Sequence, residues 1–111
     1  SHNPELVDDA MIQRYYDLSL REGTRAATLA RFGAARSSEP EPDLAVLTQP
    51  TLILWGEHDT LIPPEVGERF AAVLPDARLI IYPDAGHIPM EEVPERSAAD
   101  VRLFLEGLAP L

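Results

Sequence analysis

Two polar loops hold the residues of this sequence best suited to acid–base chemistry. Asp59 lies in "GEHDTLIPP" and His87 lies in "DAGHIPMEEVP", and each loop closely follows an apolar run. An aspartate that hydrogen-bonds a histidine can orient the imidazole and stabilise its protonated form, which is the supporting half of an acid–base–nucleophile triad. Asp59 and His87 are therefore candidates for such a pair if the fold brings the two loops together.

Other interpretations of these side chains stay open. His87 in a glycine-containing loop is also compatible with a solvent-exposed turn residue. His58 adjoins Asp59, but alternation along the chain points it away, so we expect an ordinary loop residue. A metal site built from the two histidines and Asp59 would lack a fourth ligand and the usual ligand spacing, so we expect no metal. Glu91 and Glu92 are expected to favour the start of the last helix through its dipole.

The elements around the two loops predict how they are positioned. The run "PTLILWG" at residues 50–56 and the run "ARLIIYP" at residues 77–83 are continuous and apolar, as in strands buried on both faces of a parallel sheet. A helix that starts at Pro64 separates them, which gives a β-α-β unit with parallel strands. Parallel strands end at the same edge of the sheet, about 5 Å apart. We therefore expect Asp59 and His87 to reach hydrogen-bond distance.

The remaining sequence divides into three parts. Residues 1–36 are predicted to be a helical segment, broken at Gly23 and restarted with Thr24 as the N-cap. Residues 37–49 are a polar, proline-containing linker, and residues 50–111 form a β-α-β-α unit whose last helix ends near Gly107. Two strands make a poor sheet by themselves, so we expect the end of a larger α/β sheet or one that borrows a partner strand.

Composition excludes several classes of function. The formal net charge is −10, and a strongly acidic surface repels both phosphate backbones and anionic lipids. We therefore expect neither nucleic-acid nor membrane binding. The chain has no Cys, no apolar run long enough to span a bilayer and no visible signal peptide. We expect a cytoplasmic protein.

The segments "WGEHD" with the following "IP", and "GHIPMEEVP", resemble the two C-terminal signature segments of the α/β-hydrolase superfamily. The resemblance covers about residues 44–108 and extends more weakly to the helical segment, which resembles the end of a cap domain and the helix returning to the core sheet. It is strongest to the cap-bearing soluble group, which includes carbon–carbon bond hydrolases and small-ester hydrolases. In this family the acid follows a strand as Gly-x-x-Asp, here residues 56–59, and the base follows the next strand as Gly-His. The resemblance thus implies that Asp59 is the triad acid and His87 the general base.

The nucleophile of the family is not in this sequence. It lies in a Gly-x-Ser-x-Gly elbow, and none of the five serines has glycines two residues before and two residues after it. Because the family order is nucleophile, acid, histidine, we expect the nucleophile, a serine or an aspartate, upstream of residue 1. The chain is then a truncated, C-terminal portion of an α/β-hydrolase fold that is inactive by itself.

Two functions follow as expectations. The full-length protein would hydrolyse ester or carbon–carbon bonds of a small-molecule substrate, with no metal or organic cofactor. The alternative is a non-catalytic, hydrolase-derived interaction or assembly module. In either case an unpaired strand edge recruits a partner, so we expect a homodimer or pairing with the missing N-terminal part.

Overall fold

The computed structural model of the protein describes residues 3–34 and 43–109. The predicted α/β class and the predicted order of helices, strand, helix, strand and helix are confirmed, with two short additional helices, one in the expected linker and one before the last helix. In chain order the elements are η1 (Pro4–Leu6), α1 (Asp9–Leu20), α2 (Thr24–Ala34), η2 (Leu44–Val46), β1 (Thr51–Gly56), α3 (Pro64–Val73), β2 (Ala77–Tyr82), α4 (Pro89–Glu92) and α5 (Pro94–Glu106).

The chain divides into two compact units. The αβ unit comprises Ser1–Leu6 and Asp43–Leu111, and the helical unit comprises Val7–Pro42. The predicted boundaries at residues 36, 49 and 50 stay a prediction, because residues 37–42 of the expected linker lie outside the described residues. Residues 43–49, the rest of that linker, include the short helix η2.

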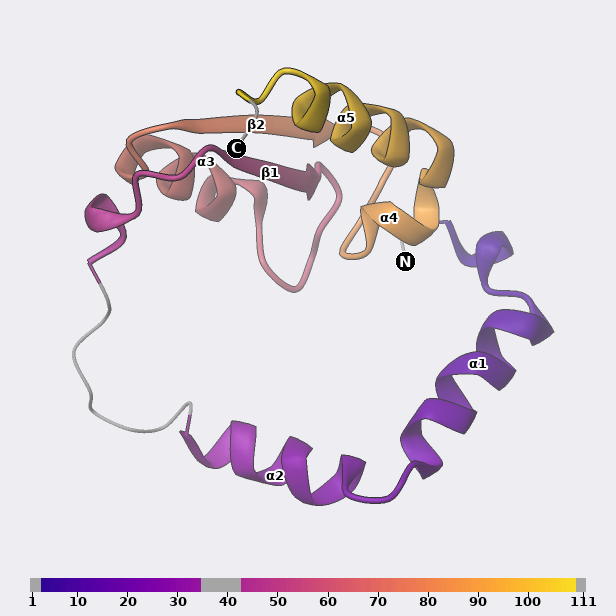
Figure 1. The fold of residues 1–111 in the computed structure, drawn as a ribbon. Coiled ribbons are helices and arrows are strands. Elements are labelled where there is room, and N and C mark those ends of the chain that lie inside the picture. Colours follow the sequence, from indigo (N-terminus) through magenta and orange to yellow (C-terminus); the bar gives the residue numbers. More distant parts are fainter. Residues whose placement is uncertain (1–2, 35–42, 110–111) are drawn as a thin grey trace. The chain divides into compact units, whose positions relative to one another are not determined.

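The sheet of the αβ unit pairs β1 with β2 in parallel. The register runs from Thr51 opposite Ala77 to Gly56 opposite Tyr82, so both strands end at the same edge. This confirms the predicted β-α-β unit. Figure 1 shows α3 and α5 on opposite faces of the sheet, with α4 beside the ends of the strands. The loops that follow the two strands therefore start side by side.

Helix α3 starts where its sequence predicts. Pro64 is its first residue, where the missing N–H of proline costs no helical hydrogen bond. α3 contacts both strands. Gly67 permits this close approach, because a Cβ there would lie 2.9 Å from Cε3 of the Trp55 ring. The absence of a side chain at Gly67 thus lets α3 lie against the end of β1.

The prediction that the strands are buried on both faces is wrong for β1 and β2. Residues 51–55 of β1 all keep partial exposure, and Gly56 is its one buried residue. In β2, Tyr82 is the one buried residue and Arg78 is exposed. The reason is that the sheet of the described residues contains two strands, so its helices cover the apolar side chains only in part. In the described residues the buried hydrophobic side chains are Met11, Tyr82 and Ala85.

The helical unit is two helices separated at a glycine. Gly23 adopts a positive φ of 84°, which confirms the predicted break. The prediction that Thr24 is the N-cap is wrong, because Thr24 is the first residue of α2 and its hydroxyl donates to the Leu18 carbonyl at 3.2 Å. At the start of α1, the Asp8 carboxylate accepts the Met11 N–H at 2.7 Å. This bond is an N-cap of the usual kind.

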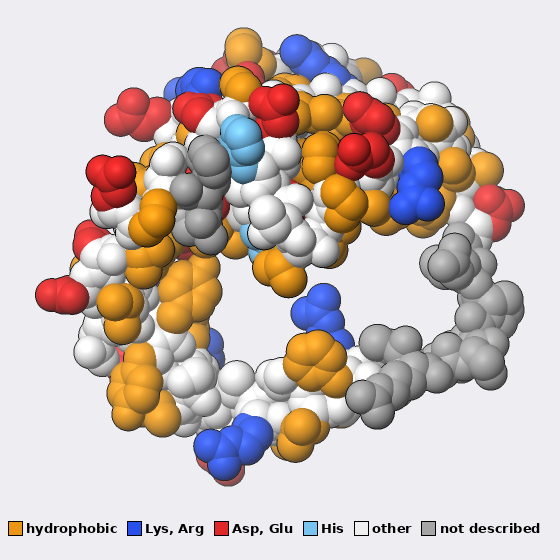
Figure 2. Space-filling view, turned by 180° about the vertical axis from the view of Figure 1, so that it is seen from behind, with side chains coloured by type: hydrophobic (Ala, Val, Ile, Leu, Met, Phe, Trp, Pro, Cys, Tyr) orange, Lys and Arg blue, Asp and Glu red, His pale blue; other side chains and the backbone are white. Residues whose placement is uncertain are grey.

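Many large hydrophobic side chains of the helical unit are exposed. Figure 2 shows hydrophobic side chains at the surface along α1 and α2 as well as on the αβ unit. The more exposed ones on the two helices are Ile12, Tyr16, Leu20, Leu29 and Phe32. In the described ranges, no helix combines the length and the apolar character that crossing a bilayer requires.

Candidate active site

The acid loop, residues 57–63, follows β1 and is ordered by bonds between near neighbours. Oδ1 of Asp59 accepts the backbone N–H groups of Leu61 at 2.9 Å and Ile62 at 3.0 Å. The indole N–H of Trp55 donates to the Ile62 carbonyl at 3.0 Å. Asp and Asn commonly close turns in this way, by bonding the backbone two or three residues ahead. The carboxylate is thereby fixed in orientation.

The base loop, residues 83–88, follows β2 and is bonded directly to the acid loop. The Glu57 N–H donates to the Tyr82 carbonyl at 2.9 Å, and the His58 N–H donates to the Ala85 carbonyl at 3.0 Å. A Cβ at Gly56 would lie only 2.0 Å from the Gly86 carbonyl oxygen. Glycine at position 56 is therefore required for the two loops to meet at this distance.

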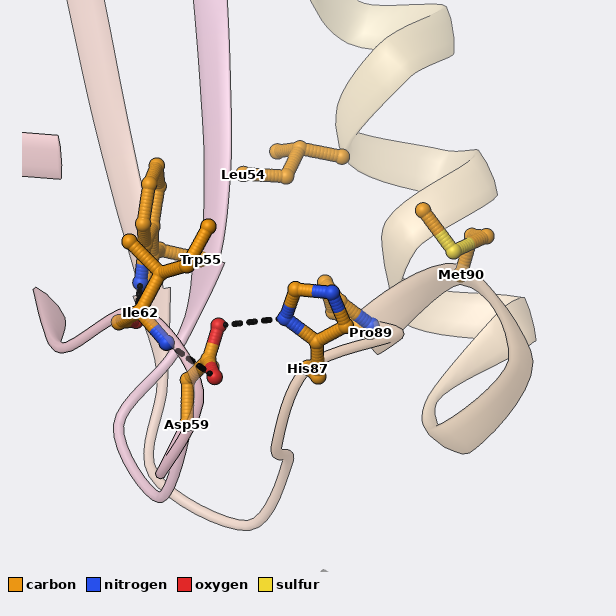
Figure 3. A pocket seen from close by; sticks show the side chains of 8 residues that line it. Leu54, Trp55, Asp59, Ile62, His87, Pro89 and Met90 are labelled. Carbon is orange, nitrogen blue, oxygen red and sulfur yellow. Dashed lines mark hydrogen bonds and ion pairs between the residues drawn. The ribbon is translucent and has the colours of Figure 1, made fainter. Parts of the chain in front are cut away.

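The two loops bring the predicted acid and base together. Nδ1 of His87 lies 2.9 Å from Oδ2 of Asp59, the oxygen that the backbone donors of the acid loop do not use. Figure 3 shows the imidazole and the carboxylate facing each other from the two loops. The expected hydrogen-bond distance is confirmed, while the catalytic roles of Asp59 and His87 stay predictions.

The charge of Asp59 decides which ring nitrogen of His87 carries the proton. Burial raises the pKa of Asp59, but the backbone donors and the His87 ring more than offset it and hold the pKa below the ordinary 3.8. At neutral pH the carboxylate is thus ionised and can only accept hydrogen bonds. Nδ1 of His87 must then carry the proton, and Nε2 of the neutral ring is left as the acceptor. This is the tautomer that a general base needs.

The Asp59–His87 pair borders an apolar hollow of about 180 Å³. The Asp59 side chain is 4 % exposed and the His87 side chain 43 %, so the imidazole remains accessible while its partner is buried. Figure 3 shows the aromatic, aliphatic and thioether side chains that surround the pair. The lining residues are Leu54, Trp55, Gly56, Asp59, Ile62, His87, Pro89 and Met90. Trp55 thus contacts α3 and also lines the hollow.

The other predicted side chains have separate positions. His58 is exposed, and its backbone N–H takes part in the bonding between the loops. Among the described residues, no three histidine or acidic side chains are grouped closely enough to hold a metal ion. Glu91 lies in α4 and is half-buried.

Glu92 has a contact that the sequence interpretation missed. Its side chain is buried, with 6 % of the residue exposed, and Oε2 accepts the Gly86 N–H at 2.8 Å. The dipole effect expected of Glu92 stays a prediction, and the structure adds a direct bond from its carboxylate to the base loop. Burial of a glutamate is not visible in a local pattern, although the glycine before His87 marks where a close contact could occur.

The start of the base loop is also held by α5. The Tyr82 hydroxyl donates to Oδ2 of Asp100 at 2.7 Å, and the Arg96 guanidinium lies 5.5 Å from the centre of the Tyr82 ring. Arg96 also forms an ion pair with Asp84. Burial, together with the hydrogen bond and charge of Asp100, raises the pKa of Tyr82 to about 12. The hydroxyl therefore stays a donor through neutral pH.

Comparison with known protein families gives a match over most of the chain. The model of the alpha/beta hydrolase fold family matches residues 5–94. This range includes β1, β2, both loops and the short helix α4.

Individual relatives extend the similarity to nearly the whole chain. The sequence is 31 % identical to the uncharacterized hydrolase YugF of Bacillus subtilis (strain 168), over 95 % of this chain and 38 % of that protein. It is 30 % identical to the 2-hydroxymuconate semialdehyde hydrolase of Pseudomonas putida, over 95 % of this chain and 40 % of that enzyme. The chain thus spans about two-fifths of the length of these relatives.

Among solved structures, a serine hydrolase involved in carbazole degradation (the CarC enzyme) has a similar fold. It superposes with a TM-score of 0.78 at 31 % identity, over 90 % of this chain and 40 % of that one. The similarity therefore includes three-dimensional arrangement as well as sequence.

Proposed function

The chain belongs to the α/β-hydrolase family, and on this premise we propose that it supplies the acid and the base of a hydrolytic triad. The observation that carries the proposal is the 2.9 Å contact between His87 Nδ1 and Asp59 Oδ2 at the common edge of two parallel strands. Open α/β sheets bind ligands at this edge. The substrate is a small molecule with an ester or a carbon–carbon bond next to a carbonyl.

In the proposed mechanism the two residues act in series. Asp59 keeps the proton on Nδ1 of His87, so that Nε2 can accept a proton from the attacking group. The imidazolium that forms is stabilised by the buried carboxylate and donates its proton to the leaving group, after which the neutral imidazole takes a proton from the water that hydrolyses the covalent intermediate. With an aspartate as nucleophile, the attacking carboxylate needs no base, and His87 acts in the water step alone. The nucleophile, a serine or an aspartate, would come from a part of the full-length protein outside residues 1–111.

The hollow beside His87 is consistent with part of a substrate site. Its volume of about 180 Å³ is below the roughly 300–1,000 Å³ of ordinary ligand pockets. Its apolar lining suits the uncharged part of a substrate. The further walls of the site would come from the same part of the full-length protein as the nucleophile.

The test is hydrolysis of p-nitrophenyl esters by the full-length gene product. We expect His87→Ala to lower kcat at least about 10³-fold, since the attacking group loses its base. His58→Ala is the matched control, because it removes an exposed histidine beside the acid and should leave kcat within about twofold. Equal activity of His87→Ala and the unmodified enzyme would refute the proposed role.

A second candidate function is a non-catalytic assembly module. It is favoured by two observations: no serine of this sequence lies in a Gly-x-Ser-x-Gly elbow, and β2 is the single partner of β1 among the described residues. An open strand edge can pair with a second copy of the chain. Sedimentation at high micromolar concentration should then give a dimer, and a compact monomer would contradict this candidate.

A further inference from the structure

The base loop is hydrogen-bonded to a buried carboxylate. Glu92 lies in the one-turn helix α4, is 6 % exposed, and accepts the Gly86 N–H through Oε2 at 2.8 Å. Burying a carboxylate is unfavourable unless hydrogen bonds replace its hydration. A bond from a backbone N–H to a carboxylate is charge-assisted and stronger than one between neutral groups. This contact therefore restrains the base loop firmly.

The contact is placed immediately before the proposed base. Gly86 and Ala85 are both buried, and they connect β2 to His87. The Ala85 carbonyl accepts the N–H of His58, which precedes it in the acid loop. The Gly86 N–H donates to Glu92, which follows it in α4. Two successive residues of the base loop are thus bonded to different elements. Together these bonds fix the position of the backbone immediately before His87.

The position of His87 is sensitive to this restraint because, among the described residues, the bond to Asp59 is the one hydrogen bond of the imidazole itself. Its side chain is 43 % exposed, so packing around the ring restricts it less than it would restrict a buried side chain. Nδ1 must nevertheless remain 2.9 Å from Oδ2 of Asp59. A backbone shift of about 1 Å in a catalytic group can cost on the order of 100-fold in rate.

We propose that Glu92 is a positioning residue of the site: its buried carboxylate holds Gly86 so that His87 meets Asp59. The inference rests on the proposed function, in which His87 is the general base. Glu92 itself touches neither substrate nor reacting atoms in this assignment. It acts through the backbone of the base loop.

Two substitutions separate the contribution of the hydrogen-bond acceptor of Glu92 from those of its charge and its volume. Glu92→Gln keeps a carbonyl oxygen at the same distance along the side chain, and Glu92→Leu removes the acceptor at similar volume. In the full-length enzyme, with kcat expressed per folded molecule, we expect Glu92→Leu to lose 10- to 100-fold in kcat with KM nearly unchanged. Glu92→Gln should recover kcat to within about threefold. Glu91→Leu, in the same helix, is the matched control and should retain kcat.

A spectroscopic measurement reads the same positioning without turnover. In the full-length protein, the Nδ1 proton of a histidine bonded to a carboxylate gives a low-field NMR signal. We expect this signal of His87, and the shift of the Gly86 amide, to change in Glu92→Leu and to remain in Glu92→Gln. If Glu92→Leu does not fold, Glu92→Asp withdraws the acceptor by one methylene and should show the same losses in kcat and signal.

The outcomes are distinguishable from failure of the proposed function. If His87→Ala keeps full activity, the proposed function fails, and the NMR signals of His87 and Gly86 still decide the role of Glu92. If the low-field signal and kcat of Glu92→Leu or Glu92→Asp equal those of the unmodified enzyme, the positioning role is overturned. Loss of kcat in Glu92→Gln equal to that in Glu92→Leu would also overturn it, because the acceptor would then not be what matters.

Discussion

The acid loop and the base loop meet at one edge of the sheet, but the hydrogen-bond partners that support them come from different parts of the chain. In the acid loop, Oδ1 of Asp59 and the indole of Trp55 bond backbone groups two to seven residues ahead. In the base loop the supports come from other helices and from the start of the chain. Glu92 in α4 bonds Gly86, Arg96 in α5 is twelve residues from Asp84, and the Asn3 side chain donates to the Asp84 carbonyl from 81 residues away.

This difference indicates which loop depends on the rest of the αβ unit. The turn that holds Asp59 is closed by its own side chains, while the start of the acid loop, at Glu57 and His58, is bonded to the base loop. The base loop takes its shape from α4, α5 and the segment before α1, and these elements must pack before His87 is in place. We therefore expect changes in distant elements to displace His87 more readily than Asp59.

The largest effect is expected where the two loops touch. Gly56→Ala would place a Cβ 2.0 Å from the Gly86 carbonyl oxygen and 2.5 Å from that of Ala85, and backbone atoms cannot yield as a flexible side chain would. We expect a loss of about 3 kcal/mol in the free energy of unfolding, measured by urea denaturation followed by circular dichroism. Gly33→Ala is the control: nothing lies within 4 Å of a Cβ there, so stability should stay equal or rise by up to about 1 kcal/mol. Equal stability of the two variants would show that the loops are not in this close contact.

A smaller effect is expected at the outer support of the base loop. Tyr82→Phe removes the hydroxyl that donates to Asp100, which should cost about 2 kcal/mol at pH 8 because the acceptor is charged. The pKa of Tyr82 is raised to about 12, above the ordinary 10.0. This contribution is thus complete below pH 10 and is lost as the pH rises through 12. Unfolding free energies of the two proteins should therefore converge over that interval.

The control for this prediction is a tyrosine on the other unit. Tyr16 in α1 is 57 % exposed, so Tyr16→Phe should change the free energy of unfolding by less than about 0.5 kcal/mol at any pH in the series. A Tyr82→Phe protein as stable as the unmodified one at pH 8 would mean that α5 does not hold the base loop through this bond.

The smallest effect is expected in the acid loop. Trp55→Phe keeps an aromatic ring beside Gly67 but removes the N–H that donates to the Ile62 carbonyl, so we expect a loss of about 1 kcal/mol. Amide hydrogen exchange should become faster at Leu61 and Ile62 and stay unchanged at Gly86, which serves as the internal control. Equal acceleration in both loops would contradict the view that the acid loop is supported locally.

The sequence predicted the elements of the αβ unit because their signals are local. Apolar runs bounded by Pro and Gly marked both strands, and Pro64 and Pro94 marked the starts of two helices. Local sequence patterns gave wrong predictions where contacts with other residues determine the structure. The capping role of Thr24 was wrong because its hydroxyl bonds back to Leu18, and full burial of β1 was wrong because burial depends on the strands and helices beside it.

The sequence by itself therefore determined that Asp59 and His87 follow two parallel strands, since strand order and direction place both loops at one edge. Only the tertiary structure decided how the two side chains are held there. The 2.0 Å separation that excludes a Cβ at Gly56, the buried bond from Glu92 to Gly86 and the bond from Tyr82 to Asp100 join different elements. Such contacts follow from the packing of elements against one another, which no short stretch of sequence contains.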